Sequence, residues 1–204
     1  MARAGLTVDK IVQAAAEMAD EHGIENVTVS ALARSFGVRD ASLYSHIRNL
    51  ADLRRRVALK AGDEQAERIA EAVAGRAGRD ALVAFANAYR DYAREHPGRY
   101  AAMQIPVDPE AAKLALKAAN DQAEGQADGK AKGSRGVEVT AAMMRAYDLP
   151  DPDLTDAVRL LRSTFHGFIS LEAHGAFGHP RDVQASWDKA LEALHQLLST
   201  WPRS

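Results

Sequence analysis

The stretch VTVSALARSFGVRDASLYSHIRNLADL, residues 27–53, contains the pattern that decides the fold. Thr28 is placed to cap a short helix, which Gly37 is placed to end. A second short helix is expected over RDASLYSHI, residues 39–47. The apolar residues that recur at helical spacing in these two segments are Val29, Leu32, Ala33, Phe36, Leu43 and Ile47. Two short helices joined at a glycine-containing turn are typical of a helix-turn-helix.

A helix upstream supplies the surface on which these two helices can pack. Thr7 is placed to cap it and Gly23 to end it. Its apolar stripe consists of Val8, Ile11, Ala15, Met18 and Ala19. Because neither short helix can bury a core by itself, we expect a three-helix unit over residues 7–48.

Composition places the chain among helical proteins. Alanine, the strongest helix former, occurs 41 times in 204 residues, whereas proline occurs 7 times. The absence of cysteine excludes a disulfide scaffold, a thiolate zinc site and a cysteine nucleophile. No apolar run reaches the roughly 18–20 residues of a membrane span, and MARAGLTVDK lacks the apolar core of a secretory signal. We therefore expect an all-α protein of the cytoplasm.

Longer helices follow the helix-turn-helix. Periodicity and breaker residues place them over residues 49–74, 80–95, 99–104, 110–124, 137–147, 154–175 and 182–201. The polar, glycine-bearing stretch over residues 125–136 is expected to be a loop. The prediction is an all-α chain of about nine helices, with an N-terminal domain over residues 1–56 and a C-terminal helical bundle over residues 57–204.

Positive charge gathers on the helix-turn-helix, although the whole chain carries a formal net charge of −2. Between residues 34 and 60 there are seven cations and only two carboxylates, Asp40 and Asp52. The cations are Arg34, Arg39, Arg48, Arg54, Arg55, Arg56 and Lys60. A local excess of this kind is typical of a face that binds double-stranded DNA, but it also occurs on an ordinary solvated helix.

The same stretch resembles the DNA-binding segment of the TetR family of transcriptional repressors. The residues that carry the resemblance are Leu32-Ala33, Gly37-Val38, Ala41, Ser42-Leu43-Tyr44 and His46. It implies that residues 1–56 bind double-stranded DNA, and that residues 57–204 bind a small effector and form a homodimer. Two positions depart from the family pattern: Ile47 stands where phenylalanine is usual, and Leu50 stands where lysine is common.

Eight residues are candidates for contact with DNA. Ala41 and Ser42 have short side chains that let the helix approach base edges, and Arg39 can reach a guanine or a phosphate. Tyr44 offers a hydroxyl and His46 a ring nitrogen to phosphate oxygens. The remaining candidates are Thr28, Ser30 and Arg48. Alternatively, Tyr44 is a half-buried core residue and His46 makes a structural hydrogen bond.

A second resemblance lies near the C-terminus, in RLLRSTFHGFISLEAHGAF, residues 159–177. It is similar to a motif of TetR-family members with a WHG-type C-terminal domain, through Arg159, His166-Gly167, Leu171-Glu172 and Gly175. Arg162 stands where that pattern has an aromatic residue. A glycine in mid-helix costs about 1 kcal/mol relative to alanine, so Gly167 predicts a close approach of another helix.

The last two predicted helices are candidates for a dimer interface. An apolar stripe as long as the one in residues 182–201 fits half of a four-helix arrangement made by two subunits. The candidate interface residues are Phe165, Gly167, Leu171, Trp187, Leu191, Leu194 and Leu198. The alternative is that the stripe packs only within its own chain. A two-fold pair would also suit an inverted-repeat operator, because one short recognition helix reads few base pairs.

Aromatic and methionine side chains between these helices are candidates for an effector pocket. They are Tyr89, Tyr92, Tyr100, Met103, Met143, Met144, Tyr147, Phe165 and Phe168. Such side chains can line an adaptable apolar pocket, but they fill cores equally well. No cofactor is expected, and His166, His174 and His179 are not spaced as a metal site.

The prediction is therefore a homodimeric DNA-binding repressor that a small organic effector releases from an inverted-repeat operator. A helical adaptor that does not bind DNA remains an alternative. An all-α enzyme is a further alternative, although the sequence contains no phosphate-binding loop, no Ser/His/Asp arrangement and no dinucleotide fingerprint.

Overall fold

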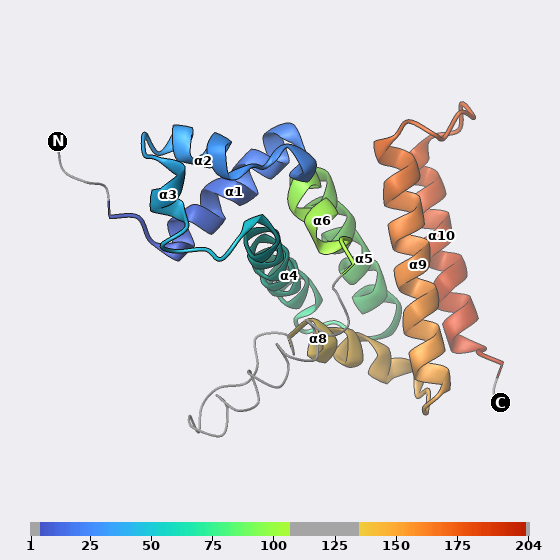
Figure 1. The fold of residues 1–204 in the computed structure, drawn as a ribbon. Helices are drawn as coiled ribbons and strands as arrows, with labels where there is room; N and C mark the ends of the chain where they lie inside the picture. Colours follow the sequence, from blue (N-terminus) through green and yellow to red (C-terminus); the bar gives the residue numbers. More distant parts are fainter. Residues whose placement is uncertain (1–4, 107–134, 203–204) are drawn as a thin grey trace, which may run out of the picture. The chain divides into compact units, whose positions relative to one another are not determined.

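The computed structural model describes residues 5–106 and 135–202, and in them it is all-α (Figure 1). The described helices are α1 (Val8–His22), α2 (Val29–Ser35), α3 (Asp40–Leu43), α4 (Leu50–Val73), α5 (Gly78–Glu95), α6 (Pro97–Met103), α8 (Arg135–Met144), α9 (Asp153–Ala173) and α10 (Val183–Ser199). Two 3₁₀ turns, η1 (Ile24–Asn26) and η2 (Arg145–Tyr147), complete them. The predicted fold class is confirmed. The helix expected over 110–124 and most of the polar loop expected over 125–136 lie outside the described residues.

The chain divides into two compact units. Within the described residues, the first unit holds residues 5–64 and 96–106, and the second holds residues 65–95 and 135–202. Helix α4 continues without a break through the division after Glu64. The first unit includes α6, which the predicted boundary at residue 57 assigned to the C-terminal bundle.

The first unit is built as the caps and stripes predict. The side chains of Thr7 and Thr28 accept hydrogen bonds from backbone N–H groups in the first turns of α1 and α2. Helices α1 to α4 bury a common apolar core, whose fully buried members include Ile11, Ala15, Leu32, Leu43, Leu53 and Val57. The third helix is shorter than the expected range 39–47. Beyond Leu43 the chain tightens into turns, in which the His46 N–H bonds to the Leu43 carbonyl three residues back.

Helix α6 lies against α1 so closely that a glycine is required. A Cβ atom at Gly98 would lie 1.9 Å from the carbonyl oxygen of Ala19, well inside van der Waals contact. Asp20 on α1 holds the same end of α6, because its carboxylate accepts from the backbone N–H of Arg99 at 2.9 Å and pairs with the Arg99 guanidinium at 3.0 Å. This contact was not anticipated from the sequence, which indicated only a break between the helices expected over residues 80–95 and 99–104.

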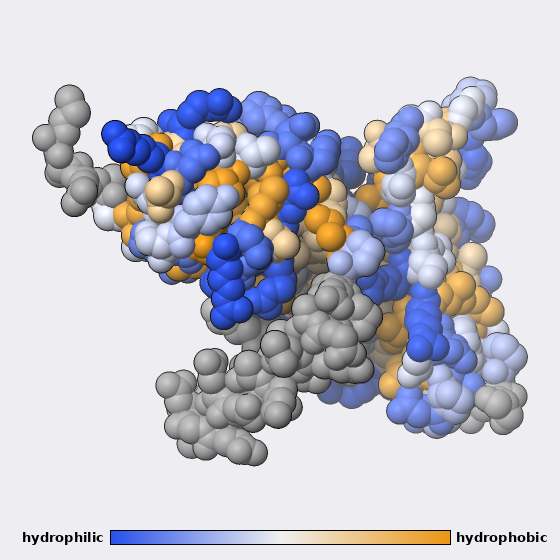
Figure 2. All heavy atoms as spheres, viewed as in Figure 1, coloured by the Kyte–Doolittle hydropathy of each residue, from blue (hydrophilic) through white to orange (hydrophobic). Residues whose placement is uncertain are grey.

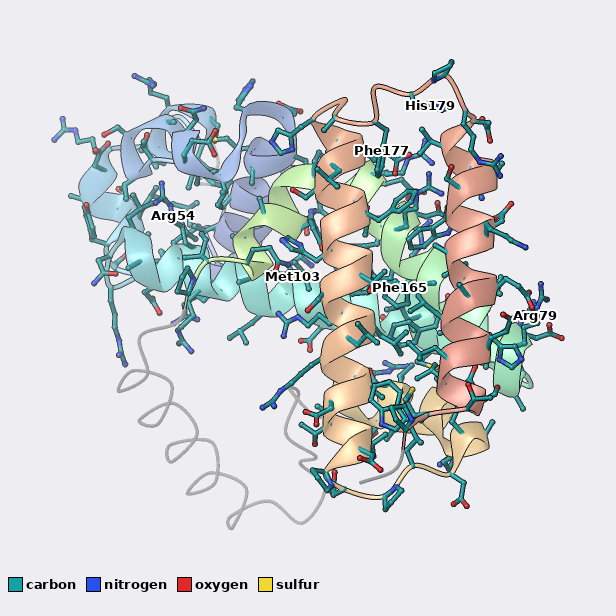
Figure 3. The ribbon with its side chains drawn as sticks, turned by 90° about the vertical axis from the view of Figure 1, so that its right-hand side faces the viewer. Arg54, Arg79, Met103, Phe165, Phe177 and His179 are labelled. Atoms are coloured by element: carbon teal, nitrogen blue, oxygen red, sulfur yellow. The ribbon has the colours of Figure 1, made fainter. Side chains whose placement is uncertain are left out.

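The second unit packs α5, α8, α9 and α10 around a core rich in aromatic side chains. Phe165 on α9, labelled in Figure 3, lies with its ring centroid 5.7 Å from that of Trp187 on α10. A buried arginine, Arg90 on α5, joins this helix to α9 and α10. Its guanidinium donates two hydrogen bonds to Glu172, at 2.6 and 2.8 Å, and a third to Gln184 at 2.7 Å.

The predicted helix ends near the second unit's core need small corrections. The described part of α8 already includes Arg135 and Gly136, ahead of the expected start at residue 137, and the helix gives way to a 3₁₀ turn after Met144. The break expected at residues 149–152 is present between η2 and α9. No helix in the described part of the chain combines the length and apolar content that crossing a membrane requires.

Candidate nucleic-acid interface

Helices α2 and α3 form the helix-turn-helix, and one glycine sets the turn between them. Gly37 has a φ of +64°, in the left-handed region that glycine adopts without strain. The Val38 N–H bonds to the Ala33 carbonyl at 2.9 Å and the Gly37 N–H to the Arg34 carbonyl at 3.1 Å, which is the Schellman pattern that ends a helix. The turn therefore stops α2 and directs the chain into α3.

Apolar anchors fix which face of α3 points outward. Leu43 and Ile47 are buried in the first unit's core, at 0 % and 2 % exposure. Ala41 and Ser42 are consequently exposed, and Tyr44 is 53 % exposed. Figure 2 shows hydrophilic side chains over the end of this unit formed by α2 and α3, with paler and some apolar ones among them. The predicted recognition residues thus share an accessible face, and Tyr44 is not the half-buried core residue of the alternative interpretation.

The other predicted contact residues differ in which of their polar groups remain available to DNA. Thr28 caps α2 through its oxygen, which leaves the hydroxyl proton free to donate. The Ser30 hydroxyl instead donates to the carboxylate of Asp40 at 2.5 Å, a partner that the sequence did not reveal. Arg39 and Arg48 are exposed, whereas His46 is partly buried.

Several of the seven cations between residues 34 and 60 are occupied by neighbours. Arg54 reaches back from α4 to the backbone carbonyls of Glu25 and Val27, at 3.0 and 3.4 Å (Figure 3). Lys60 pairs with Glu64 at 2.9 Å. Those that form no ion pair or side-chain hydrogen bond with any described residue are Arg34, Arg39 and Arg48.

Asp52 in the first turn of α4 forms ion pairs with two more of these cations. Its carboxylate lies 3.1 Å from Arg56 Nε and 3.7 Å from Arg55, and it accepts from the Arg48 backbone N–H. Burial acts to raise the pKa of Asp52, but these hydrogen bonds and the two guanidinium charges outweigh it and lower the pKa. The arginine run at residues 54–56 is therefore largely committed to the fold.

The side chains predicted to line an effector pocket are mostly packed in cores. In the second unit Met143, Met144, Tyr147, Phe165 and Tyr92 are buried, and Tyr89 and Phe168 are partly buried. Tyr100 and Met103 belong to the first unit. Burial raises the pKa of Tyr147 to about 12, and its hydroxyl lies 3.1 Å from His195 Nδ1. Core packing accounts for these side chains without a ligand.

One hollow in the second unit does involve a predicted pocket residue. It has a volume of about 320 Å³ and lies at the turn between α9 and α10. Its lining consists of Phe168, Ala176, Phe177, Gly178, His179, Arg181, Val183 and Ser186. Figure 3 shows Phe177 and His179 at that turn.

The predicted dimer residues divide into buried and accessible ones. Phe165, Trp187, Leu191, Leu194 and Leu198 are at most 8 % exposed within their own unit, so they are core residues and not available to a partner. Their stripe indicates burial but not which surface covers it. Gly167 and Leu171 lie elsewhere on α9.

Besides the predicted Leu171, α9 and α10 expose two leucines, Leu160 and Leu197, that were not among the predicted dimer residues. Leu171 is 49 % exposed, and Leu160 and Leu197, at 36 % and 39 %, are exposed with it. Leu160, Gly167 and Leu171 are spaced by seven and four residues and so share one side of α9. A Cβ atom at Gly167 would meet nothing within 4 Å, so no helix of its own described unit causes the glycine.

Two family models match the chain. Residues 11–57 match the model described as bacterial regulatory proteins, tetR family, and residues 82–194 match the model described as tetracyclin repressor-like, C-terminal domain. The HTH-type transcriptional regulator YobS of Bacillus subtilis is 33 % identical over 184 residues, covering 90 % of this chain and 88 % of YobS. The HTH-type transcriptional regulator Rv0681 of Mycobacterium tuberculosis is 33 % identical over 176 residues, covering 84 % of this chain and 72 % of that protein.

Solved structures have a similar fold at lower identity. BioQ of Mycobacterium smegmatis gives a TM-score of 0.64 at 20 % identity, covering 97 % of this chain and 100 % of BioQ. A structure of BioQ with its double-stranded DNA operator gives a TM-score of 0.60, also at 20 % identity, covering 96 % and 99 %. From the family models and the similarity to YobS we conclude that the chain belongs to the TetR family of helix-turn-helix, DNA-binding transcriptional regulators and is not an enzyme.

Proposed function

We propose that the protein is a homodimeric repressor that binds an inverted-repeat DNA operator and is released from it by a small organic effector. The observation that carries the proposal is the exposed face of α3, beside which lie arginines that form no ion pair with any described residue. Arg39 and Arg48 flank the short side chains of Ala41 and Ser42, and none of these four is buried. Short residues flanked by cations suit a helix that enters the major groove between two phosphate backbones.

Individual contacts follow from the groups that remain free. We assign Arg39 to a guanine edge or a phosphate, and Tyr44, His46 and Arg48 to phosphates. Thr28 can donate its hydroxyl proton to a phosphate while its oxygen caps α2. Arg48 supplies the positive charge that Leu50 lacks at the start of α4. Because this regulator must reach DNA, we place it in the cytoplasm.

The dimer is proposed to form through the accessible face of α9 and α10 rather than through the buried stripe. Leu160, Leu171 and Leu197 would supply apolar contact, and Gly167 would allow the partner's helix to approach closely. We also assign the C-terminal part to the WHG type, on the residues of the α9 motif. A two-fold pair of recognition helices reads an inverted repeat, which one short helix cannot specify alone.

Effector release requires that a ligand prefer one of two conformations. We propose that the effector binds in the C-terminal part and shifts α4, which is continuous from the helix-turn-helix into the second unit. This shift would change the distance between the two recognition helices of the dimer. An effector that leaves operator affinity unchanged at saturation would contradict this coupling.

The test begins with genomic DNA fragments that the purified protein retains, whose sequences define a candidate operator. Fluorescence anisotropy on that duplex should then show that Arg48→Gln loses affinity. Arg76→Gln, which removes the same charge from an exposed residue just beyond the end of α4, should keep it. Leu171→Glu should give monomers in analytical ultracentrifugation. A protein that binds no duplex would favour the adaptor interpretation, and a native monomer would contradict the dimer. Expression of a reporter placed behind the operator distinguishes a repressor from an activator.

A further inference from the structure

Asp40, the first residue of α3, places an acid where DNA contact is proposed. Its side chain is exposed, and its carboxylate accepts a hydrogen bond from the Ser30 hydroxyl of α2 at 2.5 Å. No arginine or lysine in the described part of the chain forms an ion pair with it. A carboxylate so placed is repelled by phosphates, so it needs a partner other than the DNA backbone.

The chemistry of the major groove leaves few such partners. A carboxylate only accepts hydrogen bonds, and the groove edges of guanine and thymine present only acceptors and a methyl group. The donors on base edges are the N4 amino group of cytosine and the N6 amino group of adenine. Adenine places its N7 acceptor beside N6, which an ionised carboxylate would face unfavourably. Cytosine is therefore the base that an aspartate at this position fits best.

Ser30 determines where the carboxylate points. The hydrogen bond joins α2 to the first turn of α3 and engages one carboxylate oxygen, Oδ2. Because the side chain of aspartate is short, one partner is enough to restrict its rotamers before DNA arrives. This bond also removes the Ser30 proton from the set of phosphate donors, so Ser30 acts through Asp40.

We propose that Asp40 is a specificity-determining residue that accepts a hydrogen bond from the N4 amino group of one cytosine in each operator half-site, with Ser30 as its positioning residue. The proposal rests on the DNA-binding function proposed above and identifies part of its sequence preference. It predicts that each half-site contains one C·G pair, at symmetric positions. Replacing this pair by any other base pair should lower the affinity of the protein about tenfold or more.

The decisive variant is Asp40→Asn, which keeps the size of the side chain and an oxygen that can accept from Ser30. Asparagine adds an N–H₂ donor and pairs with adenine N6 and N7. In selections of the full-length protein from a randomised duplex library, we expect the variant to change its preference at that pair from C·G to A·T and to keep the other positions. Ser30→Ala should keep cytosine but lower the discrimination severalfold. Asp9→Asn removes the same charge from an exposed residue of α1 and should leave the selected sequence unchanged.

Two results would overturn the inference and leave operator binding intact. One is an Asp40→Asn protein that selects the same sequence as the native protein. The other is an Asp40→Asn protein that binds every duplex more tightly by the same factor, because the carboxylate then acts only as a general repulsive charge. If the native protein selects no sequence at all, the proposed function fails and this inference fails with it. Circular dichroism melting of each variant checks that the fold is retained.

Discussion

Replacing Gly98 by alanine tests the close approach of α6 to α1. The added Cβ would lie 1.9 Å from the Ala19 carbonyl oxygen and 2.5 Å from the Asp20 backbone nitrogen. Ordinary contacts require about 3.5 Å, so α6 must move away from α1 by about 1.5 Å. Backbone atoms form the obstacle, so no change of side-chain rotamer can relieve the contact.

The expected loss of stability combines three contributions. Overpacking of a tight contact costs about 1–3 kcal/mol. The displacement also stretches the hydrogen bond from the Arg99 backbone N–H to Asp20, now 2.9 Å long, and the ion pair between the Arg99 guanidinium and Asp20, now 3.0 Å long. Weakening a hydrogen bond to a charged group costs about 1.5–3 kcal/mol. The better helix propensity of alanine offsets up to about 1 kcal/mol of this loss of stability. The net change in the free energy of unfolding is a loss of about 1.5–6 kcal/mol.

Urea denaturation followed by circular dichroism, at one fixed protein concentration, measures this change. Gly62→Ala is the matched control, because Gly62 lies within α4 of the same unit and an added Cβ there meets nothing within 4 Å. It should raise the free energy of unfolding by about 0.5–1 kcal/mol. A Gly98→Ala protein as stable as the native one would refute the argument from close approach.

Three further predictions concern Arg90, Glu172 and Tyr44. Arg90→Met leaves the Glu172 carboxylate without its partner and should destabilise the protein by about 3 kcal/mol in the same assay. This value is at the low end for buried pairs because Glu172 keeps 22 % exposure. Adding Glu172→Leu should restore part of the lost stability. The hydrogen bonds from Arg90 lower the pKa of Glu172 against the opposing effect of burial. The stabilisation that ionised Glu172 contributes is therefore complete above the ordinary glutamate pKa and is lost as the pH falls below it. The stability difference between the native protein and Glu172→Gln should accordingly shrink from about pH 6 to pH 3. Tyr44→Phe should weaken binding to all duplexes alike by roughly 0.5–1.5 kcal/mol in fluorescence anisotropy, and a changed base preference would contradict its phosphate role.

Features that depend on neighbouring residues were predictable from the sequence. Thr7 and Thr28 cap α1 and α2, and Gly37 has the positive φ of a helix end, because capping and turn chemistry act over three to five residues. The anchors Leu43 and Ile47 follow from helical spacing for the same reason. These local rules sufficed to place the exposed face of α3.

Features that depend on long-range contact were not predictable. Arg90 follows Ala86 by four residues on the buried face of α5, but its partners Glu172 and Gln184 lie 82 and 94 residues further along the chain. The stripe that includes Trp187 indicated burial, yet the sequence could not say that its own subunit covers it. Periodicity identifies a hidden face but not the surface that hides it.

The capture of Arg55 and Arg56 by Asp52 limits how many ions DNA binding can displace. Each phosphate neutralised by the protein releases condensed cations, and affinity falls with salt at a logarithmic slope of about −0.9 per phosphate. If all seven cations of each subunit met phosphates, the slope would approach about −13. The three arginines of each subunit that form no ion pair within the described part of the chain, Arg34, Arg39 and Arg48, give about −5. The operator complex should therefore tolerate added salt better than the charge of the sequence suggests, and Asp52→Asn, by freeing two guanidinium groups, should make it more sensitive.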